Sequence, residues 1–160
     1  ASAQYDLYVS GVTPIWRELC QSMRICSRRR GIVVEAKAWA KTIPDNVVSR
    51  LCGILDHNLD GIAGLGVLFS VHGASGIPRR GEARRRSLRD AAITQLLHYQ
   101  GSRRETCVVV FDIDDIRELA TPGALFLLLE RKVRGLRERS GLATMPASAW
   151  NEVDLPPHMT

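Results

Sequence analysis

The sequence contains no apolar run of the roughly 18 to 20 residues that a membrane-spanning helix requires. It does not open with the basic start and apolar middle of a signal peptide. It also lacks a CxxC pair, and its four cysteines (Cys20, Cys26, Cys52 and Cys107) are not spaced with its histidines as the ligands of a zinc site. We therefore expect a cytoplasmic protein that does not span a membrane. Its cysteines should be reduced and mostly buried, with a structural disulfide or a zinc site as the alternative.

Lysine is scarce, although the chain is basic. Only three of the 22 basic residues are lysines (Lys37, Lys41 and Lys132), and the net charge is +5 with a pI near 9.4. The planar guanidinium of arginine suits phosphate groups, so this composition favours a polyanionic partner. A genome rich in G and C, which encodes arginine in place of lysine whatever the function, explains the same bias, and both explanations stay open.

No internal repeat and no second block of distinct composition divides the 160 residues, of which 45% are hydrophobic. A chain of this size can bury one core. We therefore expect one α/β domain over residues 1–142. Residues 143–160 contain three prolines and little periodicity, which predicts a C-terminal tail.

Hydrophobic periodicity and turn residues divide the domain into alternating elements. Strands are expected at 4–10, 31–40, 64–71 and 106–111, and helices from Pro44 to about residue 58, from Ser87 to Gly101, and over 114–139 with a break at 121–123. Residues 15–26 fit either a short helix or a hairpin arm. Such alternation predicts a three-layer α/β sandwich in which helices flank a central mixed β-sheet.

The strand expected at 31–40 carries two charges in an otherwise apolar segment. Residues two apart share a face, so Glu35 and Lys37 should project together with Val33 and Trp39. Burying either charge alone costs several kcal/mol, and a buried pair rarely recovers its whole desolvation cost. A role beyond stability is therefore indicated, with an ordinary ion pair on a half-exposed strand as the alternative.

Val33-Val34-Glu35-Ala36-Lys37 resembles the E-x-K half of the PD-(D/E)XK signature of the restriction-endonuclease-like nucleases. A helix follows, then a strand ending in Ser-x-x-Gly (Ser70 to Gly73), then a further helix and strand, which is similar to the element order of that superfamily. Over residues 4–117 the chain is similar in particular to the catalytic domains of type IV restriction enzymes. The resemblance implies a restriction-endonuclease-like fold and metal-dependent hydrolysis of phosphodiester bonds in nucleic acid, with double-stranded DNA favoured.

The resemblance also implies roles for individual residues. Asp6 matches the superfamily's first acidic residue and should lie beside Glu35, with a solvent-facing Asp near a terminus as the alternative. Asp6, Glu35 and the carbonyl of Ala36 would hold one or two Mg²⁺ ions, which Mn²⁺ should replace. Lys37 would orient or deprotonate a metal-bound water and offset the charge that builds on the phosphate.

Further positions are implied around this centre. Gln95 matches a polar residue that the superfamily often places near the phosphate, and a surface glutamine is the alternative. Contact with the nucleic-acid backbone is expected from Lys41, next to Trp39, and from the arginines of the loop over 72–87 (Arg79, Arg80, Arg84, Arg85 and Arg86). The alternative is that this loop is a solvated segment that does not contact nucleic acid. The superfamily's opening helix and first strand have no room before Asp6, so we expect a piece of a longer, multidomain chain or a homo-oligomer.

Two other interpretations compete. Residues 108–116 resemble the nucleophile loop of haloacid-dehalogenase-type phosphatases, with Asp112 as nucleophile and Asp114 as acid and base. The motifs which that family needs downstream are missing, so a strand end and a helix start explain Asp112 to Asp115 better. The apolar run 124–129 must either complete the core or form a dimer face, which is compatible with a non-catalytic nucleic-acid-binding or assembly module.

Overall fold

The computed structural model describes residues 4–22, 30–79, 91–103 and 105–141. In chain order the elements are β1 (Leu7–Val9), α1 (Pro14–Ser22), β2 (Gly31–Lys37), α2 (Asp45–Gly53), the π-helix η1 (Ile54–Asn58), β3 (Ala63–Ser70), α3 (Ala91–Gly101), β4 (Cys107–Phe111), α4 (Ile113–Glu118) and α5 (Ala124–Arg139). The predicted alternation of strands and helices is confirmed.

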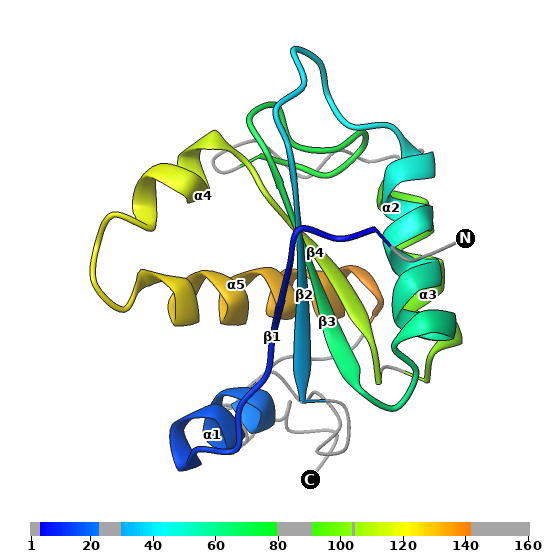
Figure 1. Ribbon diagram of the computed structural model, residues 1–160. Coiled ribbons are helices and arrows are strands. Elements are labelled where there is room, and N and C mark those ends of the chain that lie inside the picture. Colours follow the sequence, from blue (N-terminus) through cyan, green and yellow to red (C-terminus); the bar gives the residue numbers. More distant parts are fainter. Residues whose placement is uncertain (1–3, 23–29, 80–90, 104, 142–160) are drawn as a thin grey trace, which may run out of the picture.

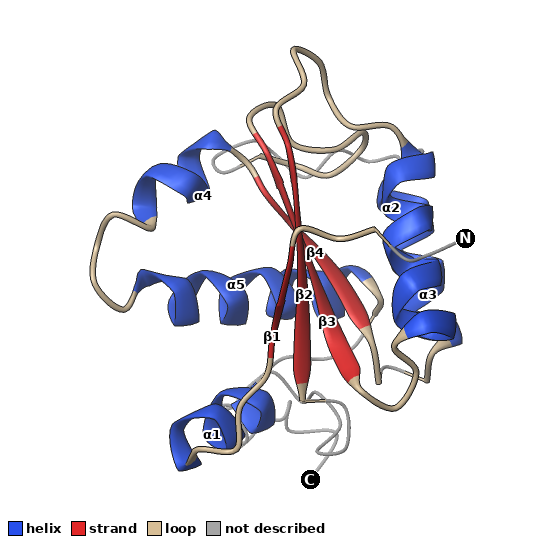
Figure 2. Cartoon of the chain, viewed as in Figure 1, coloured by secondary structure: helices blue, strands red, loops and turns tan. Residues whose placement is uncertain are grey.

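The four strands form one mixed sheet in the order β1-β2-β3-β4. β1 runs antiparallel to β2, whereas β2, β3 and β4 are parallel. Helices α2 and α3 cover one face of the sheet and α1 and α5 lie on the other (Figures 1 and 2). The expected three-layer α/β sandwich with a mixed sheet is therefore confirmed.

Alternation along the strands builds a core on each side of the sheet. Val33 and Leu68 pack in one core with residues of α2, and Val109 and Phe111 pack in the other with residues of α5. Because helices cover both faces, β3 and β4 are apolar almost throughout. Gly66 allows α2 to approach β3, since a Cβ at this position would lie 3.2 Å from side-chain atoms of Leu51.

The connections refine several predicted boundaries. Residues 15–26 were compatible with a helix or a hairpin arm, and the described part forms helix α1. The strand predicted to reach residue 40 ends at Lys37, so Trp39 lies beyond it with 44% of its surface exposed. Pro44 is the N-cap of α2 and not its first-turn residue. The break at 121–123 is confirmed, with Gly123 at φ 81° immediately before α5.

Parts of the predicted organisation concern residues outside the described ranges. These are the Ser87 cap, the tail over 143–160, residues 23–26 and Cys26. Within the described ranges, no helix has both the length and the apolar character needed to cross a membrane.

The cysteines of the described ranges agree with the predicted reduced, buried state. Cys20, Cys52 and Cys107 are all free thiols and all buried. Burial raises the pKa of Cys52 and of Cys107 from 9.0 to about 12. It also raises the pKa of Cys20, against a smaller opposing effect of Arg30. Because the thiolate is the reactive form, these groups should be inert in the folded protein.

A thiol-reactivity measurement checks this. In a Cys26→Ser variant the native protein at pH 8 is expected to react with a thiol reagent at least about 10²-fold more slowly than the same protein in guanidinium. The raised folded pKa also means that the folded state retains protons which the unfolded state releases. Cys52 and Cys107 therefore contribute stability that is complete below pH 9.0 and is lost as the pH rises toward about 12. Rapid labelling of the native protein would contradict the prediction.

Candidate functional site

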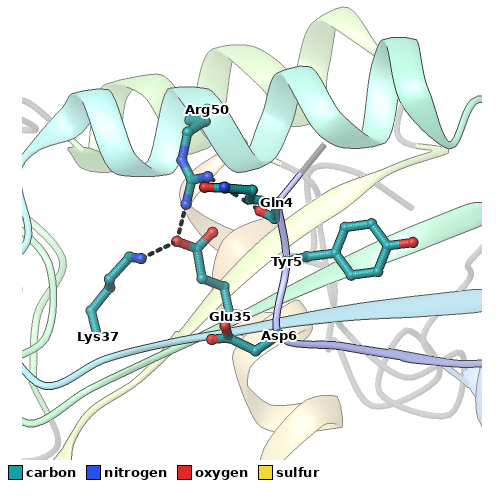
Figure 3. Close-up of a pocket in the computed structure, with 6 residues that line it drawn as sticks. All are labelled: Gln4, Tyr5, Asp6, Glu35, Lys37 and Arg50. Atoms are coloured by element: carbon teal, nitrogen blue, oxygen red, sulfur yellow. Dashed lines mark hydrogen bonds and ion pairs between the residues drawn. The ribbon is translucent and has the colours of Figure 1, made fainter. Parts of the chain in front are cut away.

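A pocket of about 360 Å³ lies where the segment before β1 meets β2 and α2. Its lining consists of Gln4, Tyr5, Asp6, Glu35, Lys37 and Arg50 (Figure 3). Three separate parts of the chain thus contribute to it. The sequence had placed three of these residues, Asp6, Glu35 and Lys37, in one site, and the structure brings all three to this pocket.

Glu35 is the buried centre of the pocket, with only 1% of its surface exposed. It pairs in register with Leu68, so strand alternation turns its side chain toward the α2 layer together with Lys37. The Lys37 Nζ lies 2.7 Å from Glu35 Oε1, and the guanidinium of Arg50 contacts the same oxygen. The second oxygen, Oε2, is buried and has no hydrogen-bond partner among the described residues.

Asp6 lies beside the E-x-K segment, as the resemblance implied. β1 pairs antiparallel with β2, and Leu7, its first residue, is opposite Val34. Asp6, the residue before β1, therefore lies next to Glu35. The Asp6 backbone N–H donates to the Val34 carbonyl (3.0 Å), and its Oδ2 accepts a hydrogen bond from the backbone N–H of Ala36 (2.7 Å). Asp6 is exposed as a residue, and Figure 3 shows its carboxylate beside the β2 backbone while the Glu35 carboxylate points toward Lys37 and Arg50.

Arg50 is the charged residue of the pocket that the sequence analysis missed, besides Gln4 and Tyr5. It lies on α2 beside the apolar stripe that packs against the sheet, three residues after Val47 and one before Leu51. From there its guanidinium contacts Glu35 and also donates to the backbone carbonyl of Gln4 (3.2 Å). The sequence did show that Arg50 flanks the apolar stripe of the helix that follows the E-x-K strand. It did not show the packing angle of that helix, which decides whether Arg50 reaches Glu35.

The oxygen atoms present suit a hard divalent cation. Glu35 Oε2 is a buried acceptor without a partner, and the Asp6 carboxylate lines the same pocket. Mg²⁺ typically takes one or two carboxylates and keeps several waters, so these two acids suffice for it. Among the described residues no group of three or more His, Cys, Asp or Glu could hold a metal ion. Glu35 and Asp6 are therefore the pocket residues that could hold a hydrated Mg²⁺ or Mn²⁺ ion, with water and substrate oxygens completing its shell.

Gln95 does not belong to this pocket, which corrects the expectation that it lies near the phosphate. The residue is buried, so it is not a surface glutamine either. Its Nε2 donates to the carbonyl of Val108 (2.6 Å), and its Oε1 accepts from Arg139 (3.0 Å). β4 is an edge strand of the sheet, and an unpaired buried carbonyl there would be costly. Gln95 satisfies it.

Replacing Gln95 with alanine should therefore affect stability. Loss of a buried hydrogen bond that leaves the Val108 carbonyl unsatisfied typically costs about 1–3 kcal/mol. Urea denaturation is expected to show a decrease of this size in the free energy of unfolding. An unchanged unfolding midpoint would show that the contact to the edge strand contributes nothing.

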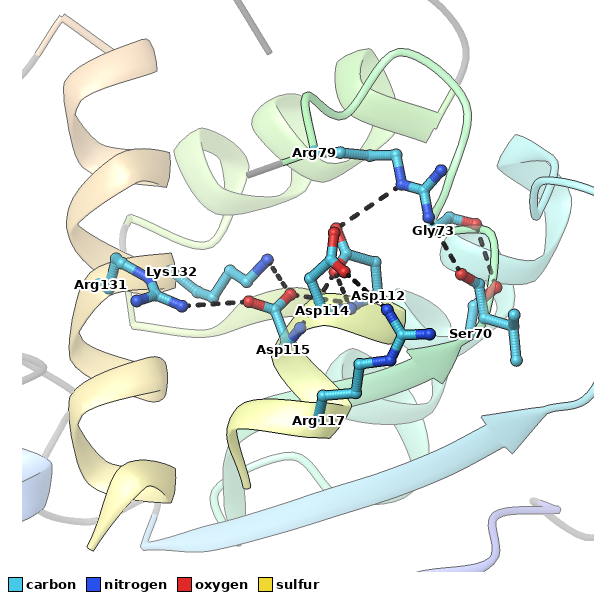
Figure 4. A network of polar contacts seen from close by, with 10 residues as sticks. Ser70, Gly73, Arg79, Asp112, Asp114, Asp115, Arg117, Arg131 and Lys132 are labelled. Atoms are coloured by element: carbon cyan, nitrogen blue, oxygen red, sulfur yellow. Dashed lines mark hydrogen bonds and ion pairs between the residues drawn. The ribbon is translucent and has the colours of Figure 1, made fainter. Parts of the chain in front are cut away.

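Of the five loop arginines expected to contact nucleic acid, the structure describes Arg79. The others lie outside the described residues: Arg80, Arg84, Arg85 and Arg86. Arg79 lies at the carboxyl ends of β3 and β4, where its NH2 donates to the Val71 carbonyl (3.4 Å) and its Nε lies 4.0 Å from Asp112 Oδ2 (Figure 4). Lys41 is exposed beyond the end of β2. Neither Arg79 nor Lys41 lines the pocket.

A second polar cluster occupies the junction of β4 and α4 (Figure 4). Asp112 Oδ1 accepts from the N–H groups of Asp114 (3.0 Å) and Asp115 (3.2 Å), and Asp115 Oδ2 accepts from the Asp112 N–H (3.0 Å). This is a capping box. The interpretation of these residues as a strand end and helix start is confirmed. Asp112 is buried, and this cap engages the carboxylate that the phosphatase interpretation needs as a nucleophile.

The apolar run at the start of α5 is divided between the core and the surface. Leu128 and Leu129 are buried and complete the core, as does Ala124. Three successive side chains stay exposed, namely those of Leu125 (43%), Phe126 (41%) and Leu127 (65%). Part of the run therefore belongs to the core, and the remainder is an apolar surface.

No protein-family model, curated protein or solved structure matched this chain.

Proposed function

We propose that this pocket is a PD-(D/E)XK-type site and that the protein is a metal-dependent nuclease, with DNA as the favoured substrate. The observation that carries the proposal is the state of Glu35. One of its oxygens binds Lys37, two residues away on the same strand, while the other is buried without a partner in the pocket that Asp6 also lines. A buried acceptor without a protein partner is uncommon in an ion pair and leaves a place for a ligand such as a metal ion or its water.

Each residue then has a separate task. Asp6 and Glu35 hold the metal, and Ala36 is the neighbouring position whose carbonyl would add a ligand. A bound Mg²⁺ supplies a water of lowered pKa and polarises the phosphate. The Lys37 ammonium contacts Glu35, and its side chain is 27% exposed and lines the pocket. There it orients the attacking water and offsets charge on the phosphate oxygens.

The surroundings of the site support the same proposal. Asp6 immediately precedes β1, which is antiparallel to the E-x-K strand, and a helix and two further parallel strands follow, in the order expected from the superfamily. The excess of arginine agrees with a polyanionic substrate. We further propose that the protein acts in the cytoplasm, as a homo-oligomer or as the catalytic part of a longer chain.

The direct test is a cleavage assay with purified protein. Supercoiled plasmid DNA and a single-stranded RNA of similar length are incubated with Mg²⁺, Mn²⁺ or EDTA. Nicking or degradation of the DNA is expected with either metal and not with EDTA. An absence of cleavage of both nucleic acids in either metal would overturn the proposal.

A second candidate is a non-catalytic nucleic-acid-binding or assembly module. The exposed side chains of Leu125, Phe126 and Leu127 favour it, because exposed large apolar side chains suit contact with another copy. For this module, affinity for DNA should fall steeply with salt, yet no cleavage should accompany binding. Size-exclusion chromatography of the wild type and of a Leu127→Ser variant would show whether this surface holds copies together.

A further inference from the structure

Glu35 has two cations on one oxygen atom. Lys37 comes from the same strand, whereas Arg50 reaches Oε1 from α2. The pocket thus contains two acids, Asp6 and Glu35, and two cations, so its formal charge is zero without any metal. A divalent cation entering this arrangement would meet two positive charges within a few ångströms, which opposes its binding. Withdrawal of one of the two cations from Glu35 would reduce this repulsion.

Arg50 is the cation that can withdraw more easily. Its side chain is 40% exposed, against 27% for Lys37. Its other contact in the pocket is one hydrogen bond to the exposed Gln4 carbonyl, which water can replace. Lys37 is tied to the strand that carries Glu35 itself. The long arginine side chain can turn from α2 into solvent while the helix stays packed on the sheet.

We infer that Arg50 is a resident counter-cation which a divalent metal displaces from Glu35, so that Arg50 sets the metal affinity of the pocket. This inference rests on the proposed function. Without metal, Arg50 compensates the buried carboxylate and keeps the pocket formed. When a metal ion compensates Glu35 instead, the guanidinium becomes available to another anion, for which a phosphate of the nucleic-acid backbone is suitable.

The test measures Mn²⁺ binding and thermal stability, independently of cleavage. Arg50→Gln removes the positive charge but keeps a polar side chain, and Arg50→Lys keeps the charge. Arg134→Gln is the matched control, because Arg134 lies on α5 and pairs with Glu130 (2.6 Å) on the protein surface. It therefore reports any effect of net charge alone.

Titration calorimetry with MnCl₂ is expected to give a dissociation constant about tenfold lower for Arg50→Gln than for the wild type. Arg50→Lys and Arg134→Gln should stay close to the wild-type value. In EDTA, Arg50→Gln should melt about 5 °C below the wild type. Saturating Mn²⁺ should close most of that gap, since the metal then compensates Glu35 in its place.

The outcomes separate the inference from the proposed function. Equal Mn²⁺ affinity of the wild type and Arg50→Gln, with the same loss of melting temperature in EDTA and in Mn²⁺, would make Arg50 a structural residue only and overturn the inference alone. No Mn²⁺ binding to either protein would overturn the proposed function as well. If Arg50→Gln does not fold, Arg50→Lys is the deciding variant. Because it keeps the positive charge, its Mn²⁺ affinity should be as weak as that of the wild type. Tighter Mn²⁺ binding by Arg50→Lys would contradict the counter-cation role.

Discussion

Replacing Lys37 with alanine is expected to lower the rate of metal-dependent DNA cleavage by about 10²–10⁴-fold, the usual contribution of a positioned proton-transfer group. Lys37 is the one ammonium that lines the pocket, and it lies 2.7 Å from the carboxylate proposed to hold the metal. Without it, the attacking water loses its orienting partner and the charge that builds on the phosphate loses a nearby cation. Initial cleavage rates in saturating Mg²⁺ measure the effect.

The Lys37→Ala protein should still fold. Glu35 keeps Arg50 as a counter-cation, so the buried carboxylate is not left uncompensated. Circular dichroism should therefore resemble that of the wild type, and the melting temperature should fall by no more than the roughly 5 °C expected for Arg50→Gln. Arg134→Ala, on the far surface of α5, serves as a charge-matched control that should cleave at the wild-type rate. Cleavage by Lys37→Ala at that same rate would remove the basis for the nuclease proposal.

Asp115→Ala is expected to cause a large loss of stability, of about 3–5 kcal/mol. Asp115 is only 1% exposed and joins three structural elements. Its carboxylate contacts Arg131 (3.2 Å) and Lys132 on α5, and it accepts from the Asp112 N–H at the end of β4. Removing it takes the carboxylate partner from Lys132, leaves Arg131 paired with Glu118 alone, and breaks the capping box of α4. Urea denaturation at neutral pH measures the loss.

Asp114→Ala is the matched control for this effect. Asp114 is the neighbouring acid of the same helix turn, but its side chain is 44% exposed and it pairs with Arg117, which is 73% exposed. An exposed pair of this kind contributes about 1 kcal/mol or less. Similar losses from Asp114→Ala and Asp115→Ala would show that burial and the contacts to α5 do not govern the stability of this junction.

Local sequence patterns were sufficient for the outline of the fold and for the Glu35–Lys37 pair of the pocket. Alternation in β2 placed Glu35 and Lys37 on one face, and the continuous apolar character of β3 indicated a strand covered on both sides; the structure agrees with both. Such patterns succeed because a side chain's direction in a strand depends on its own backbone. The same locality explains the strand end and helix start around Asp112.

The contribution of Arg50 and the true contacts of Gln95 came from tertiary structure alone. Arg50 reaches Glu35 across 15 residues of sequence, and Gln95 reaches Arg139 across 44. A helix's periodicity shows which side is apolar, but not which strand it crosses or how far along. Sequence by itself therefore determined the E-x-K pair and the sandwich that holds it. The packing of α2 and α3 on the sheet decided which distant polar groups meet, because those contacts depend on the relative placement of whole elements.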